Sequence, residues 1–398
     1  MKRFIKYLFH RDHFIVLLSG LLLLGLLRAI TINIDFLNPI ANALDDFSVT
    51  DVIYEIQHDE SKARMNDIIT IVDMTELTDR GDIAYLLEEI NACEPLVMGI
   101  DLIFEGKKDD SIANEMLKES VKVMGSKAVY STKLVDYNSN SQSFSRSVQS
   151  FFANEIHIAE GYTNLNDNLE RRRIRDFSIM QKLNDNTQLS FPAKIAAYFN
   201  NSLEQLDSQD LLINFKNEKF PVVKYDEIQE KRELIEGHIV LIGALTEEQD
   251  MHNSPIGKMS GLELQAYSLL TLLEQKNIQK IPTWLEWILV FLVCYLLEIA
   301  IDIVWQWVKK KDKSAFMVFL KESNLVSVVM LFIGLLIVCW LTYILFVKRG
   351  LLVPGGLIMG MMALTCEGRD ILIAVIKGLK AKNKDSKFVK TALLIDND

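Results

Sequence analysis

The sequence predicts an α/β domain outside a membrane, with a mainly parallel mixed sheet, joined to a four-helix transmembrane region. Two observations lead to this fold class. Four long apolar runs lie at the two ends of the chain, one before residue 33 and three after residue 283. Between them, short β-branched runs alternate with segments whose apolar residues recur at helical spacing, which is typical of strand–helix–strand units.

Each of the four apolar runs approaches or exceeds the roughly 20 residues that cross a bilayer. The first has a cleaved signal peptide as its alternative, but the small residues Ala41 and Ala43 lie far beyond its apolar core, which favours an uncleaved anchor. The predicted segments are a cytoplasmic N-terminus (1–13), a span (14–32), an outer domain (33–282), a second span (284–304), a basic cytoplasmic loop (305–324), a third span (325–347), a fourth span (351–376) and a basic cytoplasmic tail (377–398).

Lysine and arginine predict the orientation of these spans. Basic residues gather before the first span, between the second and third, and after the fourth, while only Lys348 and Arg349 lie in the opposite hairpin. Because cytoplasmic loops carry the excess of Lys and Arg, both termini should be cytoplasmic. The protein is therefore expected in a bacterial inner membrane, multi-pass, with residues 33–282 in the periplasm.

The charge and the cysteine content of the outer domain argue against several classes of function. Residues 31–283 hold 42 Asp plus Glu against 24 Lys plus Arg, a net charge of −18, whereas the whole chain carries −10. An acidic surface argues against nucleic acid as a partner. Cys93 is the only cysteine of the segment, so no disulfide can form within it, and no Cys or His spacing predicts a metal site.

The first half of the outer domain is predicted to consist of alternating strands and helices. Ile68–Val72 is a β-branched strand, Asp82–Cys93 has helical spacing, and Leu96–Ile100 is a second strand, so the two strands are expected to pair in parallel. Ala128–Leu134 is expected to be a third strand. The polar stretch Asp136–Arg146 is expected to be a surface loop.

The second half ends in a strand, a loop and a helix. Ile239–Ile242 is apolar and β-branched, and Gly243 permits a tight turn where the strand ends. A polar loop follows, and Leu262–Leu273 then shows helical spacing. The loop is therefore expected at the carboxyl end of a buried strand.

This last stretch resembles the C-terminal signature of the CHASE2 family of bacterial extracytoplasmic sensor domains. The matching residues are Val240, Leu241, Ile242, Gly243, Thr246, Asp250, Pro255, Gly261, Glu263 and Ala266, and the end of the second strand matches at Gly99, Asp101 and Phe104. Ser260 and Gln265 depart from the family's proline and histidine. The resemblance implies a sensory role. Family members commonly carry an output domain after the last span, but only 22 residues follow Ile376, so a separate effector is expected.

Three aspartates are expected at the carboxyl ends of the strands. Asp73 and Asp101 follow neighbouring predicted strands, and Asp250 follows the strand at Ile239. Open α/β sheets bind ligands in that crevice, so these carboxylates, with Ser254 of the same loop, are candidates to hold a cation or the amine of a small ligand. The alternative is that they accept hydrogen bonds as caps of helices and loops.

A basic cluster interrupts the acidic domain. Arg172, Arg173 and Arg175 are candidates to bind an anion or an acidic partner, and a solvated loop is the alternative. The sequence contains no Gly-rich phosphate loop, HExxH or GxSxG motif, and its histidines are scattered. The protein is therefore expected not to be an enzyme, and no cofactor is expected.

Two ionisable residues are expected inside the membrane. Glu298 lies in the second predicted span and Arg369 near the inner end of the fourth. Because charges at that depth usually face protein or pair with each other, we expect an ion pair between them. The alternative is that Glu298 reaches the interface or is protonated.

Two functions fit these features. In the first, the protein is a receptor subunit whose outer domain senses a signal and whose spans pass it to a separate effector. In the second, it is a structural subunit whose outer domain docks an envelope protein. Its expected partners are the lipid bilayer, an unknown small ligand or envelope protein outside, an effector or complex subunits, and a second copy of the chain. A transporter is a weaker third idea, because the spans hold few polar groups.

Overall fold

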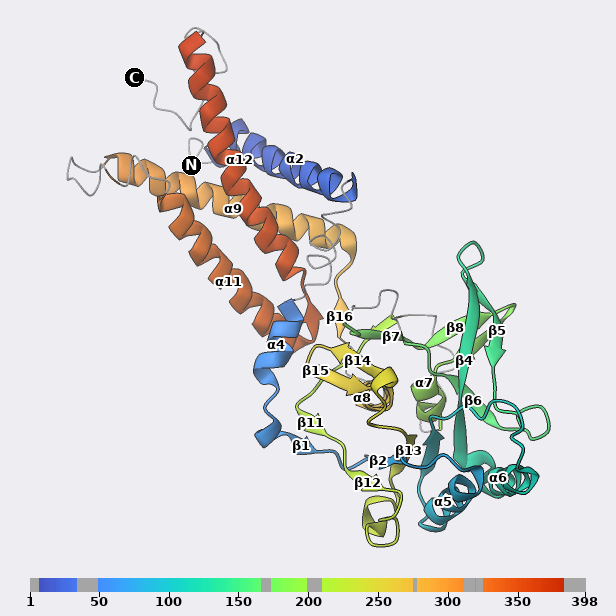
Figure 1. Cartoon of the computed structure of the whole chain (residues 1–398). Helices are drawn as coiled ribbons and strands as arrows, with labels where there is room; N and C mark the ends of the chain where they lie inside the picture. Colours follow the sequence, from blue (N-terminus) through green and yellow to red (C-terminus); the bar gives the residue numbers. More distant parts are fainter. Residues whose placement is uncertain are drawn as a thin grey trace. The chain divides into compact units, whose positions relative to one another are not determined.

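The computed structural model describes residues 7–33, 49–165, 173–198, 210–274, 278–310, 319 and 325–382. It divides into two compact units (Figure 1). One comprises residues 1–50 and 279–398, and the other comprises residues 51–278. The second unit is a mixed α/β domain and the first is helical, so the fold class predicted for the outer segment is confirmed at this level.

The α/β domain is built on one large mixed sheet. Strands β12, β2, β13, β3, β4 and β6 run parallel, whereas β4 with β5 and β8 with β9 pair antiparallel. Along the sheet the order is β12 (Val222–Lys224), β2 (Ile69–Asp73), β13 (Ile239–Gly243), β3 (Val97–Ile100), β4 (Ala128–Asn138), β5 (Ser143–Val148), β8 (Met180–Leu183) and β9 (Asn186–Leu189), with β6 (Ala159–Tyr162) beside β4.

The strand order corrects one prediction. The first two predicted strands, β2 and β3, are parallel but are not neighbours, because β13 from the end of the domain lies between them. Its register places Gly243 opposite Asp73 and Ile242 opposite both Val72 and Ile100. The most apolar strand of the domain is thus central, where both of its faces are covered.

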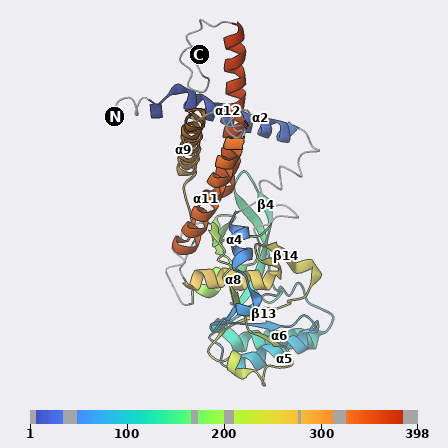
Figure 2. The same cartoon turned by 90° about the vertical axis from the view of Figure 1, so that its left-hand side faces the viewer.

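Helices cover both faces of the sheet. Figure 2 shows α5 (Arg80–Ala92) and α6 (Ser111–Met124) on one side of β13 and α8 (Gly261–Glu274) on the other. Val240 and Ile242 pack into the core beneath α5 and α6. Because side chains alternate along a strand, Leu241 faces the opposite layer, where its side chain lies beside those of Phe191 and Ile195 from α7 (Phe191–Ala196).

Two glycines let α7 approach the sheet closely. A Cβ at Gly99 would lie 2.6 Å from the Ile195 side chain, and one at Gly161 would lie 2.6 Å from the Phe191 backbone. Real Cβ atoms do not sit that close, so only glycine permits this packing. The helix begins directly after β9, which Leu189 ends, and Pro192 stands in its first turn.

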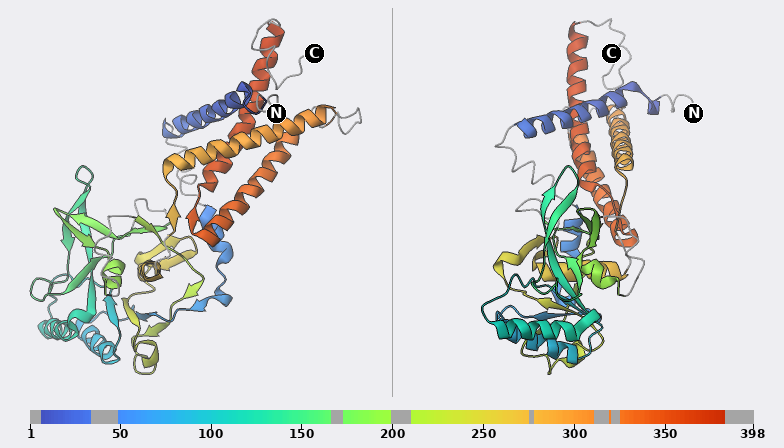
Figure 3. Two further views of the ribbon diagram at one scale, coloured as in Figure 1. Left: turned by 180° about the vertical axis from the view of Figure 1, so that it is seen from behind. Right: turned by 90° about the vertical axis from the view of Figure 1, so that its right-hand side faces the viewer.

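The stretch Asp136–Arg146, predicted as a surface loop, is instead a β-hairpin. Strand β4 continues to Asn138 and pairs with β5, with Val135 opposite Arg146 (Figure 3). The loop predicted after β13 likewise contains a small hairpin. Two-stranded pairs complete the domain: β1 (Arg64–Met65) with β11 (Glu218–Lys219), β7 (Asp176–Ser178) with β10 (Asp210–Leu212), and β14 (Met251–Ser254) with β15 (Gly257–Ser260).

Within its described residues, the helical unit contains four long helices and one short strand pair. The helices are α2 (Arg11–Asn33), α9 (Thr283–Lys310), α11 (Leu325–Arg349) and α12 (Gly355–Lys382), and β16 (Gln279–Lys280) pairs with β17 (Leu351–Leu352). Among the described residues, the helical stretches 283–308 and 325–349 are long and apolar enough to cross a membrane. Membrane crossing by α2 and α12 stays a prediction, and α12 begins after the predicted start at residue 351, which lies in β17.

Small residues bring α2 and α12 together. A Cβ at Gly368 would lie 2.3 Å from Ser19 Oγ, and one at Gly20 would lie 3.3 Å from the Thr365 backbone. Small residues at such a crossing allow the two helix backbones to approach closely.

Candidate functional site

Asp73 organises the loops at the carboxyl end of the sheet. Its Oδ1 accepts hydrogen bonds from Thr75 N at 3.0 Å and from Thr75 Oγ1 at 2.6 Å. Thr75 Oγ1 in turn accepts from the backbone of Leu245 at 3.0 Å, in the loop after β13. The carboxylate therefore holds two loops together, which matches the capping alternative.

Asp101 and Asp250 lie close enough to influence each other. Although Asp101 as a residue keeps some accessible surface, desolvation of its carboxyl and, to a smaller extent, the charge of Asp250 together raise its pKa to about 7. The Cβ of Asp101 lies 3.4 Å from where a Cβ on Gly243 would be. The end of β13 therefore lies next to this aspartate.

Asp250 and Ser260 cap helix α8. Asp250 Oδ2 accepts from Gly261 N at 3.0 Å, and His252 Nε2 lies 3.5 Å from Asp250 Oδ1. Ser260 N donates to Glu263 Oε2 at 2.9 Å while Ser260 Oγ accepts from Glu263 N at 3.2 Å, which is a capping box. Serine at position 260, where the resemblance leads one to expect proline, therefore has a structural reason.

Ser254 and Gln265 both have intramolecular partners. Ser254 is buried; its Oγ donates to Gly257 O at 2.7 Å and accepts from Ile256 N at 3.2 Å, which closes the turn between β14 and β15. Gln265 is buried on α8 and donates to Thr163 O at 3.2 Å. Within the described ranges, no group of three or more His, Cys, Asp or Glu side chains is arranged to hold a metal ion.

The basic cluster contacts the domain's own N-terminal helix. Asp51, on α4 (Val49–Gln57), is buried and accepts from Arg175 Nε at 2.8 Å and from Arg175 Nη2 at 2.5 Å. Arg173 Nη1 reaches the same carboxylate at 3.2 Å. Arg172 lies outside the described residues. The cluster thus attaches α4 to the domain. The sequence did not predict this contact, because Asp51 and Arg175 are 124 residues apart.

More contacts fix α4 in place. Ile53 and Tyr54 are buried, and Tyr54 Oη donates to Ile213 O at 3.3 Å. The Tyr54 ring meets the Phe215 ring edge to face, with centroids 5.6 Å apart. Asn217 then holds the segment after α4, accepting from Asp59 N at 3.2 Å and donating to Asp59 O at 3.1 Å.

Glu298 and Arg369 meet in the helical unit. Arg369 Nη1 donates to Glu298 Oε1, and its Nη2 donates to Asp302 Oδ1 at 3.2 Å. All three side chains are almost fully buried. Tyr7 Oη donates to Asp302 Oδ2 at 2.5 Å, and His13 Nδ1 lies 3.5 Å from Glu298 Oε1. One buried polar network therefore joins α2 and the residues before it to α9 and α12.

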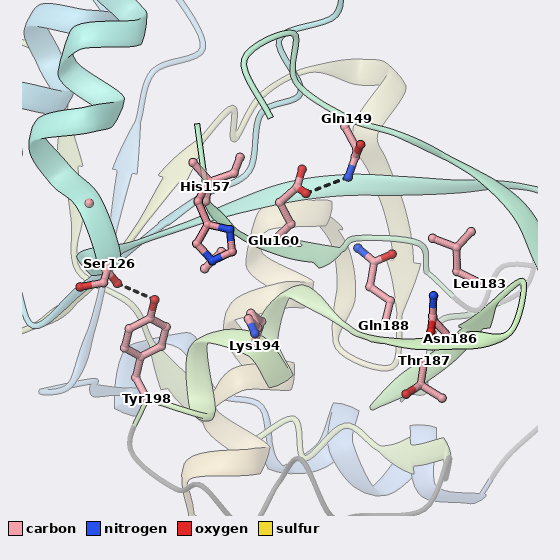
Figure 4. Close-up of a pocket in the computed structure, with 13 residues that line it drawn as sticks. Ser126, Gln149, His157, Glu160, Leu183, Asn186, Thr187, Gln188, Lys194 and Tyr198 are labelled. Atoms are coloured by element: carbon pink, nitrogen blue, oxygen red, sulfur yellow. Dashed lines mark hydrogen bonds between the residues drawn. The ribbon is translucent and has the colours of Figure 1, made fainter. Parts of the chain in front are cut away.

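A pocket of about 680 Å³ contains groups that sequence reasoning missed (Figure 4). Glu160, on β6, accepts from Gln149 Nε2 at 2.8 Å, and burial raises the pKa of its carboxyl to about 7. The signal for this site in the sequence was one acidic residue in a strand whose other residues are small or aromatic. The predicted aspartates lie elsewhere in the domain: Asp73 ends β2, and Asp101 and Asp250 lie in the loops after β3 and β13.

Comparisons with known proteins agree with the resemblance seen in the sequence. A family model described as the CHASE2 domain matches residues 16–299, which is most of the chain. Searches of curated proteins and of solved structures found no match. CHASE2 is an extracytoplasmic sensory domain. The match includes β2, β13 and the loops that Asp73, Asp101 and Asp250 organise, and on this match the chain belongs to the CHASE2 family.

Proposed function

We propose that this protein is a bacterial inner-membrane receptor subunit. Its outer domain senses an extracytoplasmic signal, and its helices pass the signal to a separate effector. The family supports sensing, and two helices long and apolar enough to cross a membrane support membrane insertion. The lysine distribution supports cytoplasmic termini, with α2 and α12 as the additional spans.

The attachment of α4 to the sensory domain carries this proposal. The domain is connected to the helical unit at both ends, through α4 toward α2 and through α8 toward α9. Asp51 is 5% exposed and receives two hydrogen bonds from Arg175. A shift in the domain that loosens or moves this contact would therefore change the position of α4, which leads back to the first predicted span.

The buried polar network supports a second stage of transmission. Two carboxylates, Glu298 and Asp302, share the single guanidinium of Arg369, and Glu298 Oε2 and Arg369 Nε have no hydrogen-bond partner among the described residues. Ionisable groups inside a membrane are costly and usually functional. A network with spare donors and acceptors can exchange hydrogen-bond partners without exposing a charge to lipid, which is what a signal passed through these helices would require.

One observation favours the structural subunit as a second candidate function. Ile112 and Met116, on the outer face of α6, are 72% and 47% exposed and line a shallow depression with Glu88 of α5. Exposed apolar side chains rimmed by acidic ones are typical of protein contact surfaces. An envelope protein bound there would make the outer domain a docking module.

The test is to purify the full chain from its native membrane and identify the proteins that accompany it. The receptor proposal expects a signalling enzyme or its regulator, whose recovery or activity changes in an Asp51→Asn variant. Asp136→Asn is the matched control, because Asp136 forms an exposed pair with Arg146 at 3.1 Å. If an envelope protein alone is recovered, lost with Ile112→Ser but unchanged by Asp51→Asn, the structural function replaces the receptor.

A further inference from the structure

The pocket beside β6 is a concave feature that neither the aspartates nor the arginines explain. Its volume of about 680 Å³ lies within the range of small-molecule sites. β6 contributes Glu160, β9 contributes Gln188, and α7 contributes Lys194. Figure 4 shows these side chains around one hollow, with Tyr198 at its side. The pocket therefore combines strands and a helix of the rigid domain rather than one loop.

Glu160 leaves one hydrogen-bond acceptor unused. Its Oε2 accepts from Gln149 Nε2 at 2.8 Å, but its Oε1 is buried and has no partner among the described residues. A buried carboxylate oxygen without a donor is costly, and a buried charge needs an opposite charge. A ligand that brings an ammonium group would satisfy both needs at once.

Two amides beside Glu160 are oriented by their own hydrogen bonds. Gln149 uses its NH₂ group toward Glu160, and Gln188 Nε2 donates to Thr132 Oγ1 at 2.9 Å. Each amide then has its carbonyl oxygen left to accept a further hydrogen bond. Several fixed acceptors near one carboxylate fit a ligand with more than one N–H donor, such as a primary ammonium.

The lining also contains one permanent positive charge. Among the described residues around the pocket, Lys194 is the one lysine or arginine and Glu160 the one carboxylate. Lys194 would repel a diamine, and Glu160 would repel a dicarboxylate. A ligand that carries one charge of each sign meets an attractive partner at both ends. The apolar side chains of Ile158 and Leu183 can contact the rest of such a ligand.

We propose that this pocket binds a free amino acid, with its ammonium group on Glu160 and its carboxylate toward Lys194. This assignment rests on the proposed sensory function and names the chemical class of the signal. Because the carboxylate must be ionised to hold an ammonium, binding should weaken as the pH falls below about 7, the pKa of Glu160. The other titratable groups that line the pocket are His157, Lys194 and Tyr198, so the loss of this pH dependence in Glu160→Gln is what assigns it to Glu160.

The experiment measures binding to the purified full chain in detergent, without any effector. Each proteinogenic L-amino acid is added singly at millimolar concentration, with putrescine and succinate as probes that carry only one sign of charge. We expect saturable heat release or a raised melting temperature with at least one amino acid, and neither with putrescine nor with succinate. Binding by no amino acid, or equal binding of either single-charge probe, overturns the assignment.

Variants then test the two charged residues. Glu160→Gln keeps the side-chain shape and should weaken amino-acid binding by about tenfold or more, as expected for one charge-assisted hydrogen bond. Lys194→Met should weaken it as well, and it carries the test if Glu160→Gln lowers the ligand-free melting temperature. Glu230→Gln, at an exposed position away from the pocket, should bind like the wild type. Unchanged affinity in both pocket variants overturns the assignment.

The two proposals fail separately. Binding to the purified chain does not involve an effector, so a missing effector leaves the pocket assignment standing. Conversely, an effector that responds to Asp51→Asn while no amino acid binds would keep the receptor and reject the ligand class.

Discussion

Replacing Asp51 by Asn should release α4 from the outer domain without unfolding the domain. The substitution keeps the size of the side chain but removes the charge that faces Arg173 and Arg175. Asp51 is 5% exposed, Arg175 is 15% exposed and Arg173 is 44% exposed. The contact is therefore buried on the carboxylate side and partly solvated on the arginine side.

The magnitude follows from that burial. Removing one partner of a fully buried pair costs about 3–5 kcal/mol, whereas exposed pairs are worth about 0–1 kcal/mol. With Arg175 largely buried and Arg173 open to solvent, we expect a loss of about 1–3 kcal/mol. Because about 1.4 kcal/mol is a factor of ten, the local opening of α4 should become about 5- to 150-fold more frequent.

Hydrogen exchange on the full chain in detergent measures this opening. Amides of residues 51–57 should lose protection by that factor, while those of β13 keep theirs. Arg175→Gln should have a larger effect than Arg173→Gln, because among the described residues Arg175 donates two hydrogen bonds to Asp51 and Arg173 donates one. Asp136→Asn, which breaks an exposed pair, is the control. Unchanged protection of α4 in Asp51→Asn, or equal effects of the two arginines, would refute the reasoning.

Three further predictions follow from single contacts. Asp101 has a folded pKa of about 7, above its ordinary 3.8, so between these pH values the folded state binds a proton that the unfolded state has released. As the pH rises from about 4 to 7, the free energy of unfolding of the wild type should therefore fall relative to that of Asp101→Asn. Denaturant titrations at several pH values measure this difference, and parallel curves for the two proteins would contradict the prediction. Glu298→Gln and Arg369→Gln should each lower the melting temperature of the full chain, and the double variant should cost less than their sum, whereas additive losses would argue against coupling. Gly99→Ala should destabilise the domain by about 1–3 kcal/mol in chemical unfolding, because its Cβ would overlap side chains of α7, and a neutral result would mean that α7 can shift.

The sequence alone determined the elements whose burial is continuous. Ile69–Asp73 and Ile239–Gly243 are strands because their β-branched residues are covered on both faces, and this pattern needs no partner to be recognised. Family membership was also visible locally, since the matching residues lie within two short stretches, each formed by a strand, β3 or β13, and the residues that follow it. The expectation of an intramembrane pair at Glu298 and Arg369 came from depth and charge, which the sequence also records, and the structure places these two side chains in contact.

Tertiary structure decided what depends on distant partners. The position of β13 between β2 and β3 reflects pairing over 170 residues, between Ile239 and Ile69, and over 142 residues, between Ile239 and Val97, which no local pattern encodes. The hairpin at Asp136–Arg146 looked like a loop because a polar, solvated strand lacks the apolar alternation by which strands are recognised. Asp51 and Arg175 are 124 residues apart, and each alone resembles a surface charge. Glu160 became a candidate only when β6, β9 and α7 enclosed it, because burial, not residue type, raises its pKa and leaves its oxygen without a partner.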